Sequence, residues 1–219
     1  MIEKFMSLAE RAYRELEERI VTLQLPPGAV LSEQKLAKEL GIGRSPIREA
    51  RQRLAQDGLV IVLPQRGILV SEINIGNHRK LLLVRRVIDG LMVRSACEFA
   101  NAIERKEFLQ LAREFDKAAK EENVKVFMQI DARFNKLLLL SANNEFIDKT
   151  AGLMSGLTRR FWYKFCEIAD QPRCARLHAK IARAVAKNDA NGAVASLNSL
   201  VDYLEKLTLV TLENRQIRS

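Results

Sequence analysis

Three arginines, Arg44, Arg48 and Arg51, are the residues whose type and spacing first suggest a chemical role in this sequence. They are four and three residues apart, so on a helix they share one face, away from the apolar Ile47 and Leu54. Cations in the first turn of a helix are disfavoured by the helix dipole, by roughly 0.3–1 kcal/mol. Stability alone would therefore favour acidic residues there. Contact with an anionic partner explains the arginines better, and a solvated arginine face on a surface helix is the alternative.

The elements around these arginines form a known motif. An apolar stripe that includes Leu36 and Leu40 predicts a short helix that breaks at Gly41, and a second helix is expected to begin near residues 43–46. Two short helices joined by a glycine-containing turn are typical of a helix-turn-helix. The N-terminal end of its second helix enters the major groove of DNA, and Arg44 lies at that end.

Two short apolar and β-branched segments follow this pair of helices, at residues 59–64 and 67–73. The sequence Pro64-Gln65-Arg66-Gly67 lies where they meet, so they predict a two-stranded hairpin with Arg66 at its tip. A hairpin directly after a helix-turn-helix is a wing, and its tip can reach a neighbouring groove or phosphate. The combined pattern predicts a winged helix-turn-helix.

Residues 26–70 resemble the DNA-binding domain of the GntR family of bacterial transcription regulators. The resemblance lies in Pro27-Gly28, Leu31, Leu36-Ala37, Leu40-Gly41, Arg44, Pro46, Arg48-Glu49-Ala50, Leu54, Gly58-Leu59 and Arg66-Gly67. It implies DNA contacts from the two helices and the wing, through Gln34, Lys35, Arg44, Ser45, Arg48, Arg66 and Gly67. Two positions depart from the family pattern, because Gln34 replaces a common arginine and Gly43 replaces a usual serine or threonine. The operator sequence is therefore not predicted.

The chain is predicted to contain two domains. An amphipathic helix at residues 5–24 precedes the helix-turn-helix, and residues 1–75 are assigned to the DNA-binding domain. Residues 72–77 are expected to form a linker, with Asn77 as a possible cap of the next helix. Residues 76–219 form the second domain.

The second domain is predicted to be an all-α bundle, which makes the protein mainly α with a small β-hairpin wing. No proline occurs between Gln65 and Gln171, and no strand-like alternation appears after Val70. Helices are expected at residues 78–101, 104–121, 124–141, 144–169, 174–187 and 190–213. The side chains expected to face the core from the first of these are Leu81, Val84, Ile88, Leu91 and Ala96.

Residues 78–213 resemble the ligand-binding FCD domain of the FadR-like GntR subfamily. The resemblance lies in residues 84–89, 131–146 and 177–197. Members of that subfamily hold a divalent metal through an Asp, a His one turn later and two further His, and a carboxylate effector completes the coordination. Asp131 and His178 match this pattern, whereas Asn135 and Leu200 stand at histidine positions. An amide is a poor transition-metal ligand, so the metal site of Asp131 and His178 is incomplete and metal is not the favoured cofactor.

A site without metal would bind an organic ligand directly. The candidate effector contacts are Arg85, Asp131, Asn135 and His178, with Arg159 as a second cation for an anionic group. Leu200 in place of a ligand makes the site more apolar, which favours a small organic acid or an acyl-type effector. The alternative is that His178 is a core histidine and that the domain is degenerate, independent of any effector, and used only for dimerisation.

The composition fits a regulator and excludes a membrane protein. The 219 residues are 47% hydrophobic and 29% charged, as in a soluble protein with a core. No apolar run approaches the roughly 18 residues of a membrane span, and the N-terminus does not resemble a signal peptide. The net charge of +9 lies mostly after residue 75, so overall basicity is not the evidence for DNA binding. Three cysteines, an odd number, favour reduced thiols in a cytoplasm.

Enzymatic activity is not expected. The sequence has only two histidines, His78 and His178, and no nucleophile–base pair or glycine-rich phosphate loop. The residues and their resemblances together predict a cytoplasmic transcription regulator, by default a repressor. It is expected to bind double-stranded operator DNA as a homodimer and to respond to a small-molecule effector in its second domain.

Overall fold

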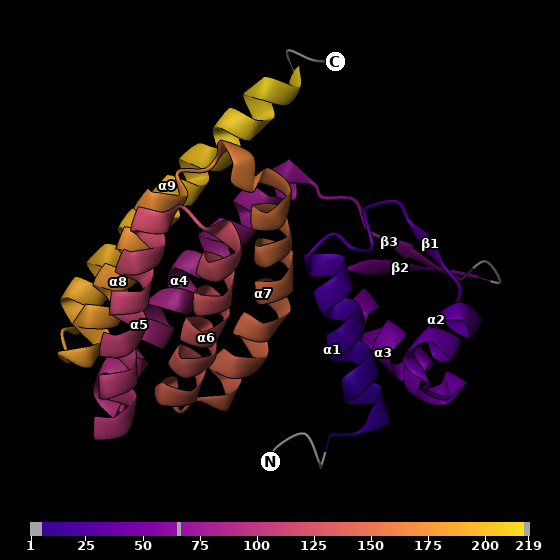
Figure 1. Ribbon diagram of the computed structural model, residues 1–219, viewed down its shortest axis with the longest axis horizontal. Helices are drawn as coiled ribbons and strands as arrows, with labels where there is room; N and C mark the ends of the chain where they lie inside the picture. The colour runs from indigo at the N-terminus through magenta and orange to yellow at the C-terminus, as the bar shows by residue number, and fades with distance from the viewer. Residues whose placement is uncertain (1–5, 65–66, 217–219) are drawn as a thin grey trace. The chain divides into compact units, whose positions relative to one another are not determined.

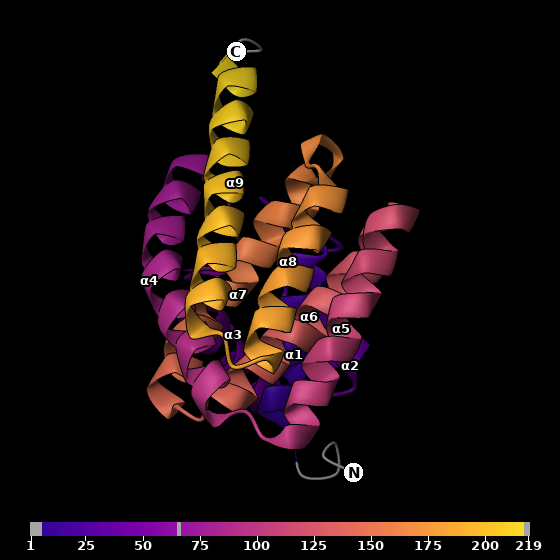
Figure 2. The same ribbon diagram turned by 90° about the vertical axis from the view of Figure 1, so that its left-hand side faces the viewer.

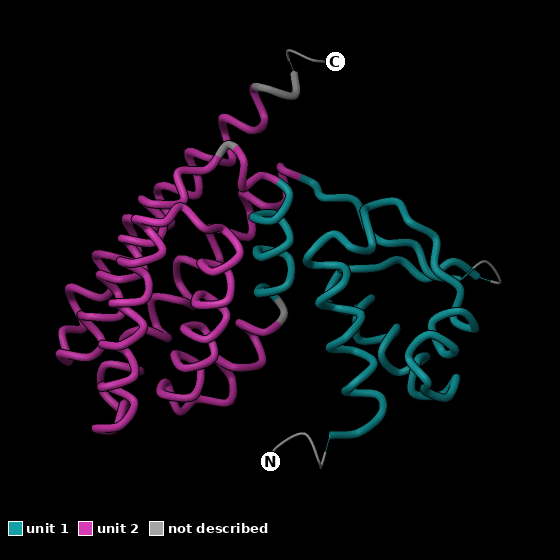
Figure 3. The backbone as a smooth tube through the Cα atoms, in the orientation of Figure 1, with its two compact units in different colours: residues 1–74, 153–164 teal, residues 75–152, 165–219 magenta. Residues whose placement is uncertain are grey.

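The computed structural model describes residues 6–64 and 67–216, leaving out the side chains of Leu153, Ile168 and residues 214–216. Within these residues the chain is mainly helical, with one small antiparallel sheet (Figure 1). The chain divides into two compact units (Figure 3). Unit 1 consists of residues 1–74 and 153–164, and unit 2 consists of residues 75–152 and 165–219.

Unit 1 holds the predicted winged helix-turn-helix. Its helices are α1 (Leu8–Val21), α2 (Glu33–Leu40) and α3 (Arg44–Gln56), and its strands are β1 (Val30–Leu31), β2 (Val60–Leu63) and β3 (Gly67–Val70). The short helices begin and end at residues suited to those places. Ser32 caps α2 by accepting a hydrogen bond from the Lys35 backbone N–H. Gly41 ends α2 in the left-handed conformation, at φ 63°.

The sheet has one strand more than the predicted hairpin. Its order is β1-β3-β2, with β1 antiparallel to β3 through the pairs Val30–Leu69 and Leu31–Ile68. The prediction of a two-stranded wing was therefore incomplete. A two-residue strand is too short to show alternation in the sequence, and its partner lies almost forty residues further along the chain.

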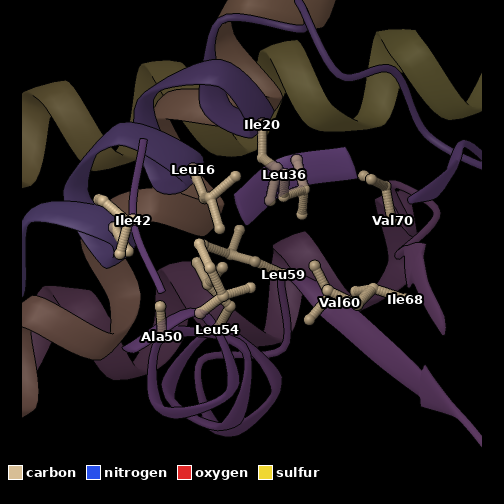
Figure 4. Packing of buried hydrophobic residues seen from close by; sticks show 12 residues of the cluster. Leu16, Ile20, Leu36, Ile42, Ala50, Leu54, Leu59, Val60, Ile68 and Val70 are labelled. Carbon is tan, nitrogen blue, oxygen red and sulfur yellow. The ribbon is translucent and has the colours of Figure 1, made fainter. Parts of the chain in front are cut away.

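The core of unit 1 joins all these elements (Figure 4). Leu16 and Ile20 of α1, Ile47 of α3 and Ile68 of β3 are fully buried in it. Each such side chain contributes roughly 1.5–3 kcal/mol by its removal from water. The burial of Ile47 fixes the rotation of α3 about its own axis, and with it the direction of the polar side chains of that helix.

Unit 2 is a helical bundle (Figure 2). Its elements are α4 (Ile75–Phe99), α5 (Ala102–Glu121), α6 (Val124–Ala142), α7 (Glu145–Phe165), the 3-10 turn η2 (Cys166–Ile168), α8 (Gln171–Ala186) and α9 (Ala190–Gln216). Residues 153–164 of α7 belong to unit 1. Helix α5 packs on α8, and α4 packs on α9 and α6. None of the helices among the described residues is long and apolar enough to cross a membrane.

Several predicted helix ends were wrong. Helix α4 begins at Ile75, so Asn77 lies inside it and is not its cap. Helix α8 begins at Gln171, with Pro172 in its first turn and Asp170 as its N-cap. Proline is tolerated there because the first N–H groups of a helix have no partner within it. Helix α7 ends at Phe165 and is followed by the 3-10 turn.

The predicted core face of α4 was also partly wrong. Ala96 is buried as expected, but Val84 and Leu91 are half exposed. Leu82 and Met92 are buried instead. The residues of α4 are apolar on more than one face, so periodicity could not decide which face packs on α6 and α9.

Candidate DNA-binding surface and bundle site

The predicted DNA-contacting side chains at the start of α3 are exposed. Arg44, Ser45 and Arg48 all lie on the outer face, because Ile47 on the opposite face is buried. The first turn of α3 has no acidic residue, and its N-cap, Gly43, makes no side-chain hydrogen bond. The free N–H groups of this turn and the two guanidinium groups therefore form a positively polarised helix end.

Two further predicted contacts lie on α2. Gln34 and Lys35 are exposed in the first turn of that helix. Lys35 lies 3.9 Å from Glu39, measured between the ammonium nitrogen and a carboxylate oxygen, and both side chains are well exposed. An ion pair in such a place is worth little, so the lysine can exchange Glu39 for a phosphate.

Glu33 separates the arginines of α3 into two groups. Its carboxylate is paired with Arg51, whose side chain is only 21% exposed. The same carboxylate lies 3.3 Å from the Nε of Arg48, whose side chain is 62% exposed. Arg51 therefore fixes α2 against α3, while Arg48 remains available to solvent. Sequence reasoning missed Glu33, since residues 15 to 18 positions apart have no shared periodicity.

Arg53, also on α3, is held by contacts with side chains of α1. It donates a hydrogen bond to Glu10 at 2.5 Å and stacks over the Tyr13 ring, with its guanidinium carbon 4.0 Å from the ring centroid. The hydrogen bond from Arg53 lowers the pKa of Glu10. The Tyr13 hydroxyl donates to Asp57 at 2.7 Å, and burial together with this bond raises the pKa of Tyr13. These contacts hold α3 against α1.

The wing contains the remaining two predicted contacts. Arg66 lies outside the described residues. Gly67 begins β3 opposite Leu63 and has a φ of 101°, a conformation that side chains rarely adopt. A Cβ atom at this position would collide with the backbone carbonyl oxygen of Leu31. The structure thus gives Gly67 a backbone role in bringing β3 close to β1.

In unit 2 the structure brings together three predicted effector contacts. His178 of α8 lies with its Nε2 3.1 Å from Oδ1 of Asp131 on α6. Asn135, one turn after Asp131, donates to the backbone oxygen of Asp131 at 2.9 Å and to its Oδ1 at 3.0 Å. The His178 Nδ1 lies 2.8 Å from the Cys174 carbonyl oxygen. We call Arg85, Asp89, Asp131, Asn135 and His178 the bundle site.

The two neighbours of the His178 ring fix its protons. A carbonyl oxygen only accepts hydrogen bonds, so Nδ1 must carry a proton toward Cys174. The other nitrogen faces a carboxylate oxygen, and a hydrogen bond there needs one more proton, on Nε2 or on Asp131. The rings of Phe115, Phe127 and Phe134 lie around His178, with centroids 5.1, 5.5 and 5.8 Å from its ring centroid. The pair is therefore a close polar contact with aromatic side chains around it.

Arg85 and Asp89 add a second charge pair to the bundle site. The guanidinium of Arg85 donates a hydrogen bond from Nε to Oδ2 of Asp89 at 2.9 Å, and a terminal nitrogen forms an ion pair with the same oxygen at 2.7 Å. Burial raises the pKa of Asp89, Arg85 opposes that rise, and the charge of Asp131 adds to it. Asp89 was missed by sequence reasoning, although its spacing of four from Arg85 was a usable signal.

One further histidine and one further predicted arginine remain to be placed. His78 of α4 is buried, and burial together with the charge of Arg85 lowers the pKa of His78 to about 3. Arg159 is the other predicted anion partner. It belongs to the part of α7 in unit 1 and donates to Glu18 at 2.9 Å.

The donor set at the bundle site does not fit a tight transition-metal site. Asp131 and His178 face one another at hydrogen-bond distance, and Asn135 is turned toward Asp131. Leu200, at the remaining position implied by the family, is a buried apolar side chain. Among the described residues no group of three or more His, Cys, Asp or Glu side chains is placed to hold a metal ion, and a structural or catalytic zinc needs three or four such ligands.

Comparisons with known proteins cover both parts of the chain. The family model described as "Bacterial regulatory proteins, gntR family" matches residues 8–70, and the FCD domain model matches residues 80–203. The chain is 26% identical over 214 residues to the HTH-type transcriptional repressor RspR of Escherichia coli strain K12, a match that covers 96% of this chain and 91% of that protein. It is 24% identical to the HTH-type transcriptional regulator Mce2R of Mycobacterium tuberculosis, over 97% of this chain and 96% of that protein.

Solved structures with the same fold are also found. The E. coli protein McbR/YncC superposes with a TM-score of 0.80 at 18% identity, covering 95% of this chain and all of that chain. A GntR regulator from Rhodococcus sp. RHA1 superposes with a TM-score of 0.72 at 24% identity, covering 93% of this chain and 98% of that chain. At these identities the superpositions show the fold.

Proposed function

The chain belongs to the GntR family of bacterial regulatory proteins with an FCD domain and is therefore a transcriptional regulator, and on that premise we propose that it is a repressor controlled by a small effector. Residues 1–75 would bind operator DNA, and residues 76–219 would bind the effector and form a homodimer. Regulators of this family are not enzymes, and the bundle site is assigned to binding. The regulator would act in the cytoplasm, where its operator DNA lies.

The observation that carries the DNA-binding proposal is the exposed start of α3. Arg44, Ser45 and Arg48 protrude from a helix whose opposite face is fixed in the core by Ile47. An arginine in this place can donate two hydrogen bonds to the edge of a guanine in the major groove. Glu33 limits the freedom of Arg48 before DNA binds, because it lies 3.3 Å away.

An electrophoretic mobility shift on the DNA upstream of the protein's own gene tests this proposal. Arg48→Ala should weaken binding to that fragment by roughly 5- to 150-fold, the range expected for one bidentate base contact. Arg113→Ala, a change of an exposed arginine on α5, serves as the matched control and should leave binding unchanged. Equal loss on unrelated DNA would assign Arg48 to phosphate contact, and no loss would contradict the proposed surface.

The effector proposal rests on the bundle site. Asn135, His178 and Arg85 supply hydrogen-bond donors around the buried carboxylate of Asp89 and the partly buried carboxylate of Asp131. A small organic acid or acyl compound would bind by exchanging one of the internal pairs for its own anion. Such an exchange would shift the contacts between α4, α6 and α8. The effector would then change the affinity for DNA, and DNA would change the affinity for the effector by the same factor.

The second candidate is an effector-independent FCD domain. It is favoured by one observation, since Arg85 is paired with Asp89 and His178 with Asp131, so these side chains have partners within the chain itself. Thermal melts distinguish the two. Ligands that bind only the folded state raise the melting temperature, so a panel of organic acids and acyl compounds should contain one that raises it. A rise with Zn²⁺, Ni²⁺ or Mn²⁺ after EDTA treatment would instead show a metal site.

A further inference from the structure

Helix α4 has an outward face whose residues repeat with a coiled-coil spacing. This face consists of Lys80, Val84, Val87, Leu91, Arg94 and Glu98, which we call the α4 stripe. Successive members are four, three, four, three and four residues apart, the spacing of a and d positions in a heptad. All six are exposed, although three of them are aliphatic. The opposite face of α4 packs on α6 and α9, so α4 forms an edge of the bundle (Figure 2).

The apolar centre of the stripe is unusual for a solvated surface. Val87 is 70% exposed, Val84 and Leu91 are about half exposed, and Leu83 beside them is also open to solvent. Single exposed apolar residues are common, but neighbouring ones on one face indicate an interaction surface. The same residues, Val84 and Leu91, have the periodicity of a buried helix face, which explains why the sequence predicted them to lie in a core.

The order of charges along the stripe identifies its partner. In an antiparallel pair of two α4 helices centred on residue 89, Val87 of one copy lies opposite Leu91 of the other, and Leu91 opposite Val87. Lys80 then lies opposite Glu98 at both ends. A parallel pair would place Lys80 against Lys80 and Arg94 against Arg94, which is repulsive. The stripe is therefore complementary to itself in the antiparallel direction only.

We infer that the α4 stripe is the self-association surface of this protein, with a second copy of the chain packed antiparallel on it. The inference rests on the proposed homodimeric function and adds the surface and its register. The aliphatic stem of Arg94 would cover Val84 of the other copy, while its guanidinium keeps its contact with Asn191 at 3.5 Å. A two-fold axis through this contact relates two identical DNA-binding units, as a pseudo-palindromic operator requires.

Sedimentation analysis of the full-length chain tests the surface. Val87→Glu places a carboxylate twice at the centre of the contact, and the dimer dissociation constant should rise at least roughly 100-fold. Leu140→Glu on α6 is the matched control, because Leu140 is an equally exposed aliphatic residue, at 67%. It should leave the dissociation constant unchanged. A Val87→Glu variant that stays dimeric, or a wild type that is monomeric, would overturn the inference, and circular dichroism shows that each variant is folded.

Charge reversal tests the register. Lys80→Glu and Glu98→Lys should each weaken the dimer roughly 3- to 30-fold, since each removes two exposed pairs and introduces repulsion. The double variant should restore wild-type association, because the two exchanged side chains again face each other with opposite charges. Weakening that the double variant does not relieve would contradict the antiparallel register. A wild type that forms a dimer through the stripe but does not shift operator DNA would contradict the proposed function alone.

Discussion

The start of α3 and the bundle site both contain arginines, but they treat those charges in opposite ways. On α3, Arg44 and Arg48 are exposed, and the nearest carboxylate touches Arg48 only at 3.3 Å. In the bundle, Arg85 is largely buried and is held to Asp89 by one hydrogen bond and by an ion pair at 2.7 Å. A surface that binds a polyanion leaves its cations in water, where a charged side chain loses none of its hydration free energy. A site inside a bundle must neutralise every charge before a ligand arrives.

The largest effect is expected when Arg85, the cation of the bundle site, is removed. Arg85→Met leaves the Asp89 carboxylate buried without its partner, and the free energy of unfolding should fall by about 4 kcal/mol. Urea unfolding measures it. Arg48→Ala, the equivalent change on α3, should cost less than about 1 kcal/mol, because its ion pair is exposed. Equal losses in the two variants would contradict the contrast between the two regions.

A change at Gly67 tests whether the wing depends on backbone geometry. Gly67→Ala must adopt a φ near 101° and places a methyl group against the carbonyl oxygen of Leu31. We expect a loss of about 3 kcal/mol in the free energy of unfolding, together with weaker operator binding. Gly43→Ala is the control, because a Cβ at Gly43 makes only an ordinary contact with Pro46 and φ there is −63°. A stable Gly67→Ala variant would show that β1 can move away.

The pH dependence of stability should come from unit 2, which contains both histidines. The pKa of His78 is lowered from 6.5 to about 3 in the folded protein, so between these values the unfolded chain binds more protons. The stability that neutral His78 contributes is therefore fully present above pH 6.5 and is lost as the pH decreases. At pH 5 the loss from His78 is about 2 kcal/mol. Urea unfolding at pH 7 and pH 5 measures it, and His78→Gln should remove most of this slope. An unchanged slope in that variant would assign the acid sensitivity to other groups.

The smallest expected effect concerns Glu33, the carboxylate that faces α3. Glu33→Gln frees Arg48 and removes a negative charge beside the DNA, so affinity for any DNA should rise roughly 2- to 5-fold and depend more steeply on salt. Stability should fall by about 1 kcal/mol, because the amide oxygen of Gln can still accept a hydrogen bond from Arg51 after the charge is lost. Fluorescence anisotropy with operator and unrelated DNA measures both affinities. Lower affinity would instead show that Glu33 positions Arg48 for its target.

Local sequence signals were enough to predict the winged helix-turn-helix, the long helices of the bundle and the family. Those signals include the break at Gly41 and the periodicity of Ile47 and Leu54 on α3. The family resemblance also identified Asp131, Asn135 and His178, which the structure brings together although α6 and α8 are far apart in the chain.

Which charges are paired and which faces are buried depends on contacts between distant segments. β1 exists because residues 30 and 31 meet β3, and nothing within two residues can indicate that partner. Arg51 and Arg48 differ because Glu33, on a different helix, forms a largely buried pair with Arg51 and leaves Arg48 exposed. On α4 both faces are apolar, so the sequence could not tell the face that packs on α6 and α9 from the face left open. Local periodicity fixes the type of an element, whereas its burial depends on neighbours that the local sequence does not contain.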